Sequence, residues 1–152
     1  MKLFSLLAAC GGVLLAGAVV LPGARALDRP GTITITDTQL RHAHVEAGPL
    51  GRGAGDLDIY TLRLFNKRIR GNAIGRGTMV CTAVGGTGQA CGATYSLPKG
   101  AIVVQGLITS RLIYELPVIG GTGIYNNVRG SVTVTSLTRK PSRELLVFRL
   151  VV

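Results

Sequence analysis

Two cysteines flank a glycine-rich turn in the middle of the sequence. Cys81 and Cys91 lie on either side of the segment Gly85-Gly86-Thr87-Gly88. If the flanking residues pair as a β-hairpin, the two sulfur atoms lie close together. The pair then serves either as a disulfide bond or as the source of a nucleophilic thiol, because a disulfide leaves no free thiolate.

Two histidines and two aspartates occur at spacings of two residues. His42 and His44 share a face of an extended chain, but two histidines without a further pair nearby are a weak signal for a metal site. We interpret them as part of a mobile, glycine-rich loop over residues 42–55, near one end of the molecule. Asp56 and Asp58 also share a face, and unpaired buried carboxylates are costly, so we expect at least one of them at a rim. These residues imply no metal and no cofactor.

Four tyrosines combine an apolar ring with a polar tip, and a buried tyrosine usually finds a partner for its hydroxyl group. We therefore expect Tyr60, Tyr114 and Tyr125 to line a substrate cavity, and Tyr95 to give polar assistance to chemistry there. The remaining motif, Gly120-Gly121-Thr122-Gly123, has the composition of a phosphate loop. A phosphate loop needs a helix after it, whereas residues 128–137 have the pattern of a strand, so we interpret the motif as a tight turn with bulge geometry.

The elements that must position these residues are strands. β-Branched and aromatic residues alternate with polar ones between glycine-rich turns, and no stretch has the spacing of an amphipathic helix. The predicted strands are 31–40, 56–65, 74–84, 89–97, 101–109, 111–119, 128–137 and 143–151. They indicate an all-β domain, either a sandwich or an up-and-down barrel. A closed barrel has no exposed strand edges, and one of eight strands is wide enough to hold one small ligand.

The N-terminal segment has the pattern of a secretory signal peptide. Met1 and Lys2 precede an uncharged, apolar run from Leu3 to Leu21, and Ala24-Arg25-Ala26 offers small residues for cleavage. We predict a signal peptide over residues 1–26, a mature domain over residues 27–152, and secretion without stable membrane insertion. The alternative is a retained N-terminal anchor, because the run is near the length of a membrane span. Export to an oxidising compartment favours the disulfide over the thiol.

The chain is strongly basic, with a formal net charge of +10. Removing residues 1–26 takes away Lys2 and Arg25 and none of the 7 acids, so the predicted mature domain carries +8. This balance favours an anionic partner. Nucleic acid is a poor candidate, because the chain has no tryptophan and few aromatic platforms for base stacking. A small hydrophobic and possibly charged ligand fits the predicted barrel better.

The stretch Leu116 to Gly130 reads LPVIGGTGIYNNVRG and resembles the barrel-closing motif of dirigent proteins. Other segments resemble allene oxide cyclases in the same order, from Gly55-Asp56-Leu57 to Leu146-Val147-Phe148-Arg149-Leu150. The resemblance covers roughly residues 55–150. It implies a single calycin-like, eight-stranded antiparallel barrel, often assembled as a trimer, whose preshaped cavity steers ring closure or stereochemistry.

The same resemblance suggests site residues. The family's catalytic carboxylate lies on the first strand, where Asp37 is the only acid, and the arginine of the dirigent motif corresponds to Arg129. A dirigent-like acid is missing between residues 116 and 143, so Glu115 is the nearest substitute. The cyclases carry a cavity cysteine at Cys81, but where they have an asparagine this chain has Leu62.

Two functions remain open at this point. The first is an intramolecular cyclase of the isomerase class, with Asp37, Glu115, Arg129 and Tyr95 as the candidate catalytic residues. The second is a non-catalytic ligand-binding or cell-envelope accessory barrel. A buried carboxyl group with a raised pKa beside apolar walls favours the cyclase, whereas a purely apolar cavity favours binding.

Overall fold

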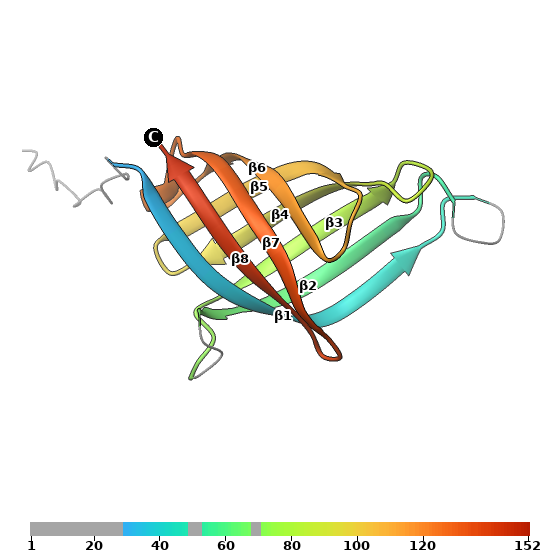
Figure 1. Ribbon diagram of the computed structural model, residues 1–152, viewed down its shortest axis with the longest axis horizontal. Helices are drawn as coiled ribbons and strands as arrows, with labels where there is room; N and C mark the ends of the chain where they lie inside the picture. The colour runs from blue at the N-terminus through green and yellow to red at the C-terminus, as the bar shows by residue number, and fades with distance from the viewer. Residues whose placement is uncertain (1–28, 49–52, 68–70) are drawn as a thin grey trace, which may run out of the picture.

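The computed structural model describes residues 29–48, 53–67 and 71–152. Eight strands pair in sequence order, each antiparallel to the next, and the last pairs with the first to close a barrel (Figure 1). The predicted all-β, eight-stranded antiparallel barrel is therefore confirmed. The strands are β1 Gly31–Val45, β2 Leu57–Asn66, β3 Gly75–Ala83, β4 Gln89–Leu97, β5 Gly100–Ile108, β6 Ile113–Gly121, β7 Arg129–Arg139 and β8 Ser142–Val151, with one 3-10 helix, η1 Gly123–Tyr125.

Strand β1 is longer than the sequence predicted. It continues to Val45, so His42 and His44 are paired with β2 and do not belong to a mobile loop. The register between the two strands shifts between Gln39 and Arg41, which is a β-bulge. The bulge lets the strand bend and continue, and that continuation places both histidines beside β2. Residues 49–52 of the predicted loop lie outside the described residues.

Period-two alternation fills the inside of the barrel with apolar side chains. In β8, for example, Leu146, Phe148 and Leu150 are buried, whereas the intervening Arg149 is exposed. Phe148 meets Tyr95 of β4 edge to face, with ring centroids 5.4 Å apart. Such packing is worth about 1 kcal/mol beyond the burial of the rings. One part of the interior is therefore solid, and the site described below is confined to the rest.

The glycine motif closes the barrel by allowing close backbone approach. Gly130 has φ +128°, and a Cβ there would collide with the carbonyl oxygen of Arg149 on β8. A Cβ on Gly121 would lie 2.5 Å from the carbonyl oxygens of both Ala101 and Tyr125. Helix η1 follows this glycine, and no long helix follows it as a phosphate loop would need.

The predicted signal peptide, residues 1–26, lies outside the described residues. Within the part of the chain that the structure describes, no helix has the length and apolar character needed to span a membrane.

Candidate functional site

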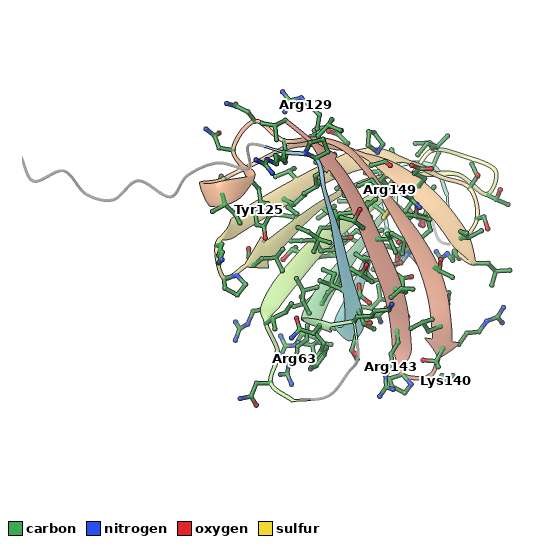
Figure 2. All side chains as sticks on the ribbon, turned by 60° about the vertical axis from the view of Figure 1, so that its left-hand side comes forward. Arg63, Tyr125, Arg129, Lys140, Arg143 and Arg149 are labelled. Carbon is green, nitrogen blue, oxygen red and sulfur yellow. A yellow bond between two sulfur atoms is a disulfide. The ribbon has the colours of Figure 1, made fainter. Side chains whose placement is uncertain are left out.

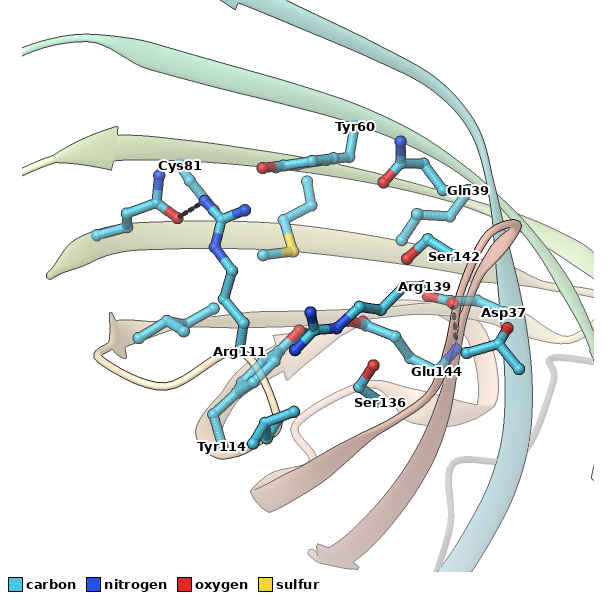
Figure 3. Close-up of a pocket in the computed structure, with 16 residues that line it drawn as sticks. Asp37, Gln39, Tyr60, Cys81, Arg111, Tyr114, Ser136, Arg139, Ser142 and Glu144 are labelled. Carbon is cyan, nitrogen blue, oxygen red and sulfur yellow. Dashed lines mark hydrogen bonds between the residues drawn. The ribbon is translucent and has the colours of Figure 1, made fainter. Parts of the chain in front are cut away.

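A cavity of about 480 Å³ opens inside the barrel. Every strand contributes to its wall, together with the connection between β5 and β6, so it is the open part of the barrel interior (Figure 3). The lining residues are Asp37, Gln39, Tyr60, Leu62, Met79, Cys81, Gln89, Ile108, Arg111, Leu112, Tyr114, Ser136, Thr138, Arg139, Ser142 and Glu144. This volume suits one small molecule.

Two carboxyl groups lie next to each other on the cavity wall. Asp37 on β1 and Glu144 on β8 are directly paired in the strand register, and the backbone N–H of Glu144 donates to Asp37 Oδ1 at 3.2 Å. Asp37 is 1 % exposed, and its second oxygen, Oδ2, has no hydrogen-bond partner among the described residues. Burial, reinforced by the nearby Glu144, raises the pKa of Asp37 to about 8. Asp37 is therefore a neutral acid with a proton to give at pH 7.

Glu144 is held in a different environment from Asp37. Burial raises its pKa, but a hydrogen bond from Tyr114 and the charge of Arg111 both act to lower it. The Tyr114 hydroxyl donates to Glu144 Oε2 at 3.2 Å. Burial in turn raises the pKa of Tyr114, and Glu144 adds to this effect, so the phenol stays protonated. The result is a row of Asp37, Glu144 and Tyr114, in which Asp37 accepts from the backbone of Glu144 and Tyr114 donates to its side chain. Such a row can both donate and accept a proton.

Tyr95 lies close to this row without lining the cavity. It is 1 % exposed, and burial raises its pKa, with further contributions from Asp37 and Glu144. Tyr95 is therefore a buried core residue near the carboxyl pair, and it is not among the residues that line the cavity. Tyr60 and Tyr114 do line the cavity, as the sequence predicted.

The other candidates from the sequence lie elsewhere. Glu115 is exposed because alternation along β6 turns it to the outer face, opposite to Tyr114. Arg129 begins β7, roughly 30 Å along the strand from the cavity residue Arg139. Its Nη1 donates to the carbonyl oxygen of Val128 at 2.9 Å. Tyr125 is buried in η1, and Figure 2 shows it with Arg129 at the end of the barrel away from Lys140 and Arg143.

Cys81 and Cys91 form a disulfide with an S–S distance of 2.08 Å. They are direct partners across β3 and β4, and both are buried. Cys81 contributes to the cavity wall. The thiol alternative is therefore wrong for this state of the chain, since the sulfur of Cys81 is already bonded.

A polar cluster lies beside the cavity, where β1 extends along β2. Asp58 Oδ1 is 2.7 Å from His42 Nε2 and 3.0 Å from His44 Nδ1, and the ring of His42 stacks on Tyr60 at 4.7 Å. Burial acts to raise the pKa of Asp58, but hydrogen bonds from the two histidines and Gln89 outweigh it and lower that pKa to about 2.

Asp56 belongs to the same cluster. It accepts hydrogen bonds from the backbone N–H groups of Ala47 and Gly53, which lower its pKa. Asp56 and Asp58 are both buried, and hydrogen bonds offset the cost of that burial. Both line a second hollow of about 290 Å³ that adjoins the cavity at Gln89 and Arg111. Across the described ranges, no group of three histidine, cysteine, aspartate or glutamate side chains is arranged to hold a metal ion.

Sequence reasoning missed Glu144, the most important partner of Asp37. A signal for it was present, because Glu144 is in phase with Leu146, Phe148 and Leu150, which face the interior of the barrel. An acid in phase with an apolar inner face is a candidate for a buried site. Gln39, Arg111 and Arg139 were also missed. Their place in the cavity depends on the bulge in β1 and on the loops at the barrel end.

Comparisons with known proteins place this fold. No family model matches the chain, and no curated protein matches it. Among solved structures, a pyocyanin demethylase matches with a TM-score of 0.69 and 25% identity, over 80% of this chain and 100% of that one. A Diels–Alderase from Streptomyces koyangensis matches with a TM-score of 0.65 and 19% identity, over 82% and 70% of the two chains.

Dirigent proteins also match. A pterocarpan synthase dirigent protein gives a TM-score of 0.61 and 15% identity, over 81% of this chain and 94% of that chain. At these identities the likeness concerns the fold. The barrel of this chain has the same fold as these Diels–Alderase and dirigent barrels.

Proposed function

We propose that this protein is an exported isomerase that closes a ring, or sets the stereochemistry of ring closure, in a small hydrophobic substrate. The observation that carries the proposal is the Asp37–Glu144 pair on the wall of an otherwise partly apolar cavity. A neutral acid beside a second carboxyl group is able to give one proton and take another within one turnover. The isomerisation is balanced in protons and electrons, but it leaves the proton on Glu144, and this proton returns to Asp37 through the cavity or through solvent before the next turnover.

Each cavity residue has a role in this proposal. Asp37 donates its proton to a carbonyl or epoxide oxygen, and Glu144 accepts a proton from carbon or from a hydroxyl group. Tyr114 holds Glu144 Oε2 and keeps that carboxylate aimed at the cavity. The apolar side chains of Leu62, Met79 and Ile108 confine the substrate to one folded conformer. Confinement lowers the entropic barrier to ring closure and selects one face for attack.

A non-catalytic binding barrel explains this cavity less well. An apolar ligand needs no carboxyl group beside it, and burying Asp37 costs free energy that a binding protein gains nothing from. Export is supported by the signal-like segment at residues 1–26 and fits the Cys81–Cys91 disulfide. The trimer that the family resemblance implies stays a prediction.

The proposal is tested by the stereochemistry of a spontaneous reaction. A fatty-acid allene oxide and a linear polyketide triene each close a ring without an enzyme and give mixed stereoisomers. We expect the wild-type protein to enrich one stereoisomer from at least one of these precursors, as measured by chiral chromatography. Asp37→Asn and Glu144→Gln return the product ratio to that of buffer, whereas the exposed Glu46→Gln keeps the enrichment.

An unchanged product ratio with wild-type protein, for every precursor, contradicts the proposed isomerase. A second candidate follows from the pyocyanin demethylase, whose whole length is covered at 25% identity. It predicts that the protein removes the methyl group of pyocyanin, which is followed by the visible absorbance of pyocyanin and by mass spectrometry of the product. This assay separates the two candidates, because the isomerase leaves pyocyanin unchanged.

A further inference from the structure

Two arginines at the cavity form no ion pair with a carboxylate of the described residues, although the charge of Arg111 acts on the pKa of Glu144. Arg111, between β5 and β6, and Arg139, at the end of β7, both line the cavity and are both exposed. Every ion pair found among the described residues joins a histidine to an aspartate, and none involves an arginine. Arg139 makes no hydrogen bond through its side chain within that same part of the chain. Figure 3 shows it extending from the β7–β8 hairpin across the opening toward Tyr114.

The carboxyl groups inside the cavity do not neutralise these cations. Asp37 keeps its proton at pH 7, because its pKa is raised to about 8. Glu144 carries at most one negative charge, against the two positive charges of the arginines. Among the residues that line the cavity, positive charge therefore exceeds negative charge, while the Asp58 carboxylate lies behind Gln89 in the adjoining hollow. A positively lined cleft with low-dielectric walls concentrates anionic ligands.

A chain of hydrogen bonds fixes where Arg111 lies. Gln89 Nε2 donates to Asp58 Oδ2 at 2.9 Å, so the other end of the same amide, Oε1, faces Arg111. Arg111 Nη2 donates to that oxygen at 3.2 Å. His42 and His44 hold Asp58 on its opposite oxygen. Gln89 takes only one N–H of Arg111, so the guanidinium group, which lines the cavity, keeps donors without a hydrogen-bond partner among the described residues.

We propose that Arg111 and Arg139 form an oxyanion subsite at the cavity opening, which binds the carboxylate or phosphate end of an amphipathic substrate. The apolar remainder of such a molecule enters between Leu62, Met79 and Ile108 and reaches the Asp37–Glu144 pair. Gln89 is a positioning residue for Arg111. Since the subsite names the substrate class of the isomerase, this inference rests on the proposed function.

Isothermal titration calorimetry on the protein tests the subsite with three ligands whose alkyl chains have the same length. Decanoate carries a carboxylate, decyl phosphate carries a phosphate, and decanol carries no charge. We expect an anionic ligand to bind about tenfold more tightly than decanol, since hydrogen bonds to charged groups are stronger than those to neutral groups. Tighter binding of decanoate indicates a fatty-acid-like substrate, and tighter binding of decyl phosphate indicates a phosphorylated one.

Variants assign the preference to the two arginines. Arg111→Gln and Arg139→Gln each reduce the affinity for the preferred anion by about tenfold and leave the affinity for decanol unchanged. The matched control is Arg63→Gln, which removes the same charge from the outer face of β2 and leaves the preference intact. Gln89→Ala lowers the ratio of anion to decanol affinity, whereas a general structural defect lowers both affinities together.

The outcomes that overturn the subsite differ from those that overturn the isomerase. Equal affinity for decanol and both anions, no binding of any ligand, or an equal loss in Arg63→Gln and Arg111→Gln contradicts the subsite. Arginine-dependent binding without any stereochemical enrichment contradicts the isomerase and leaves the subsite standing. Enrichment that persists in Arg111→Gln, together with arginine-independent binding, contradicts the subsite alone.

Discussion

Asp37 and Glu144 face each other across the seam where the first and last strands pair, and the backbone N–H of Glu144 donates to Asp37 Oδ1. This contact joins residues far apart in the sequence. This hydrogen bond replaces only part of the hydration that the Asp37 carboxyl group has in water, because Oδ2 has no hydrogen-bond partner in the described part of the chain. The barrel therefore holds an acid that is easier to keep neutral than to ionise.

The first prediction concerns stability against pH. The unfolded chain ionises Asp37 near pH 3.8, but the folded barrel keeps the proton until pH is about 8. Between these values the folded state binds more protons, so the free energy of unfolding falls as pH rises. Asp37→Asn cannot ionise. We expect it to match the wild type at pH 4 and to exceed it at pH 8.5, by at most about 5 kcal/mol.

Urea unfolding at the two pH values measures this difference, and Glu46→Gln is the control because Glu46 is exposed. The control keeps the pH dependence of the wild type. A wild type and an Asp37→Asn variant that run parallel from pH 4 to 8.5 would show that Asp37 ionises freely, and the acid role given to it would be wrong.

The second prediction concerns the disulfide. Cys81 and Cys91 are separated by 10 positions, and closing a loop of that length restricts the unfolded chain. We expect the double variant Cys81→Ala and Cys91→Ala to lose about 3 kcal/mol of unfolding free energy. A reductant destabilises the wild type by a similar amount and leaves the double variant unchanged. A wild type that is insensitive to reductant during unfolding contradicts the disulfide.

The third prediction concerns Asp58. Hydrogen bonds from His42, His44 and Gln89 overcome the effect of burial and lower the pKa of this carboxyl group to about 2. A lowered pKa in the folded state contributes stability above pH 3.8, and this contribution is lost as pH falls toward 2. We expect Asp58→Asn to be less stable than the wild type at pH 6, with the gap closing between pH 4 and 2. If the difference in unfolding free energy between the two proteins stays constant over this range, Asp58→Asn destabilises the fold through the shape of its side chain and not through the lost charge.

The fourth prediction concerns Gly130, at the start of β7. Gly130→Ala places a Cβ against the carbonyl oxygen of Arg149 and strains a backbone with φ +128°. We expect a loss of about 2–4 kcal/mol in unfolding free energy. Gly31→Ala is the matched control, because a Cβ at Gly31 meets nothing within 4 Å. Equal thermal midpoints for the two variants would show that β7 and β8 can move apart at Gly130 without cost.

Much of the fold could be predicted from the sequence, because each strand carries its own alternation and most of the turns contain glycine or proline. Asp37 could be predicted as a site residue since it is the one acid within a strongly alternating strand. Glu115 was predicted as a site residue but lies outside the cavity. Its neighbour Tyr114 faces inward, so alternation along β6 turns Glu115 outward. Arg129 was placed by its motif, but the cavity opens at the other end of the same strand.

Other parts of the site could not be predicted locally. The extension of β1 depends on a bulge and on contacts with Asp58 from another strand. The pairing of Asp37 with Glu144 depends on the closing register, which no short sequence window contains. Arg111 lies in the connection between β5 and β6 and Arg139 is the last residue of β7, where the alternation rule no longer determines direction.

The position of the acid pair on the closing seam has a consequence for biogenesis. Asp37 is near the start of the domain and Glu144 is on the last strand, so the pair comes into being only when β8 docks against β1. A contact of such large sequence separation forms late and slowly during folding. A nascent or truncated chain that lacks β8 also lacks the Asp37–Glu144 pair. Under the proposed function, such a chain has no isomerase activity.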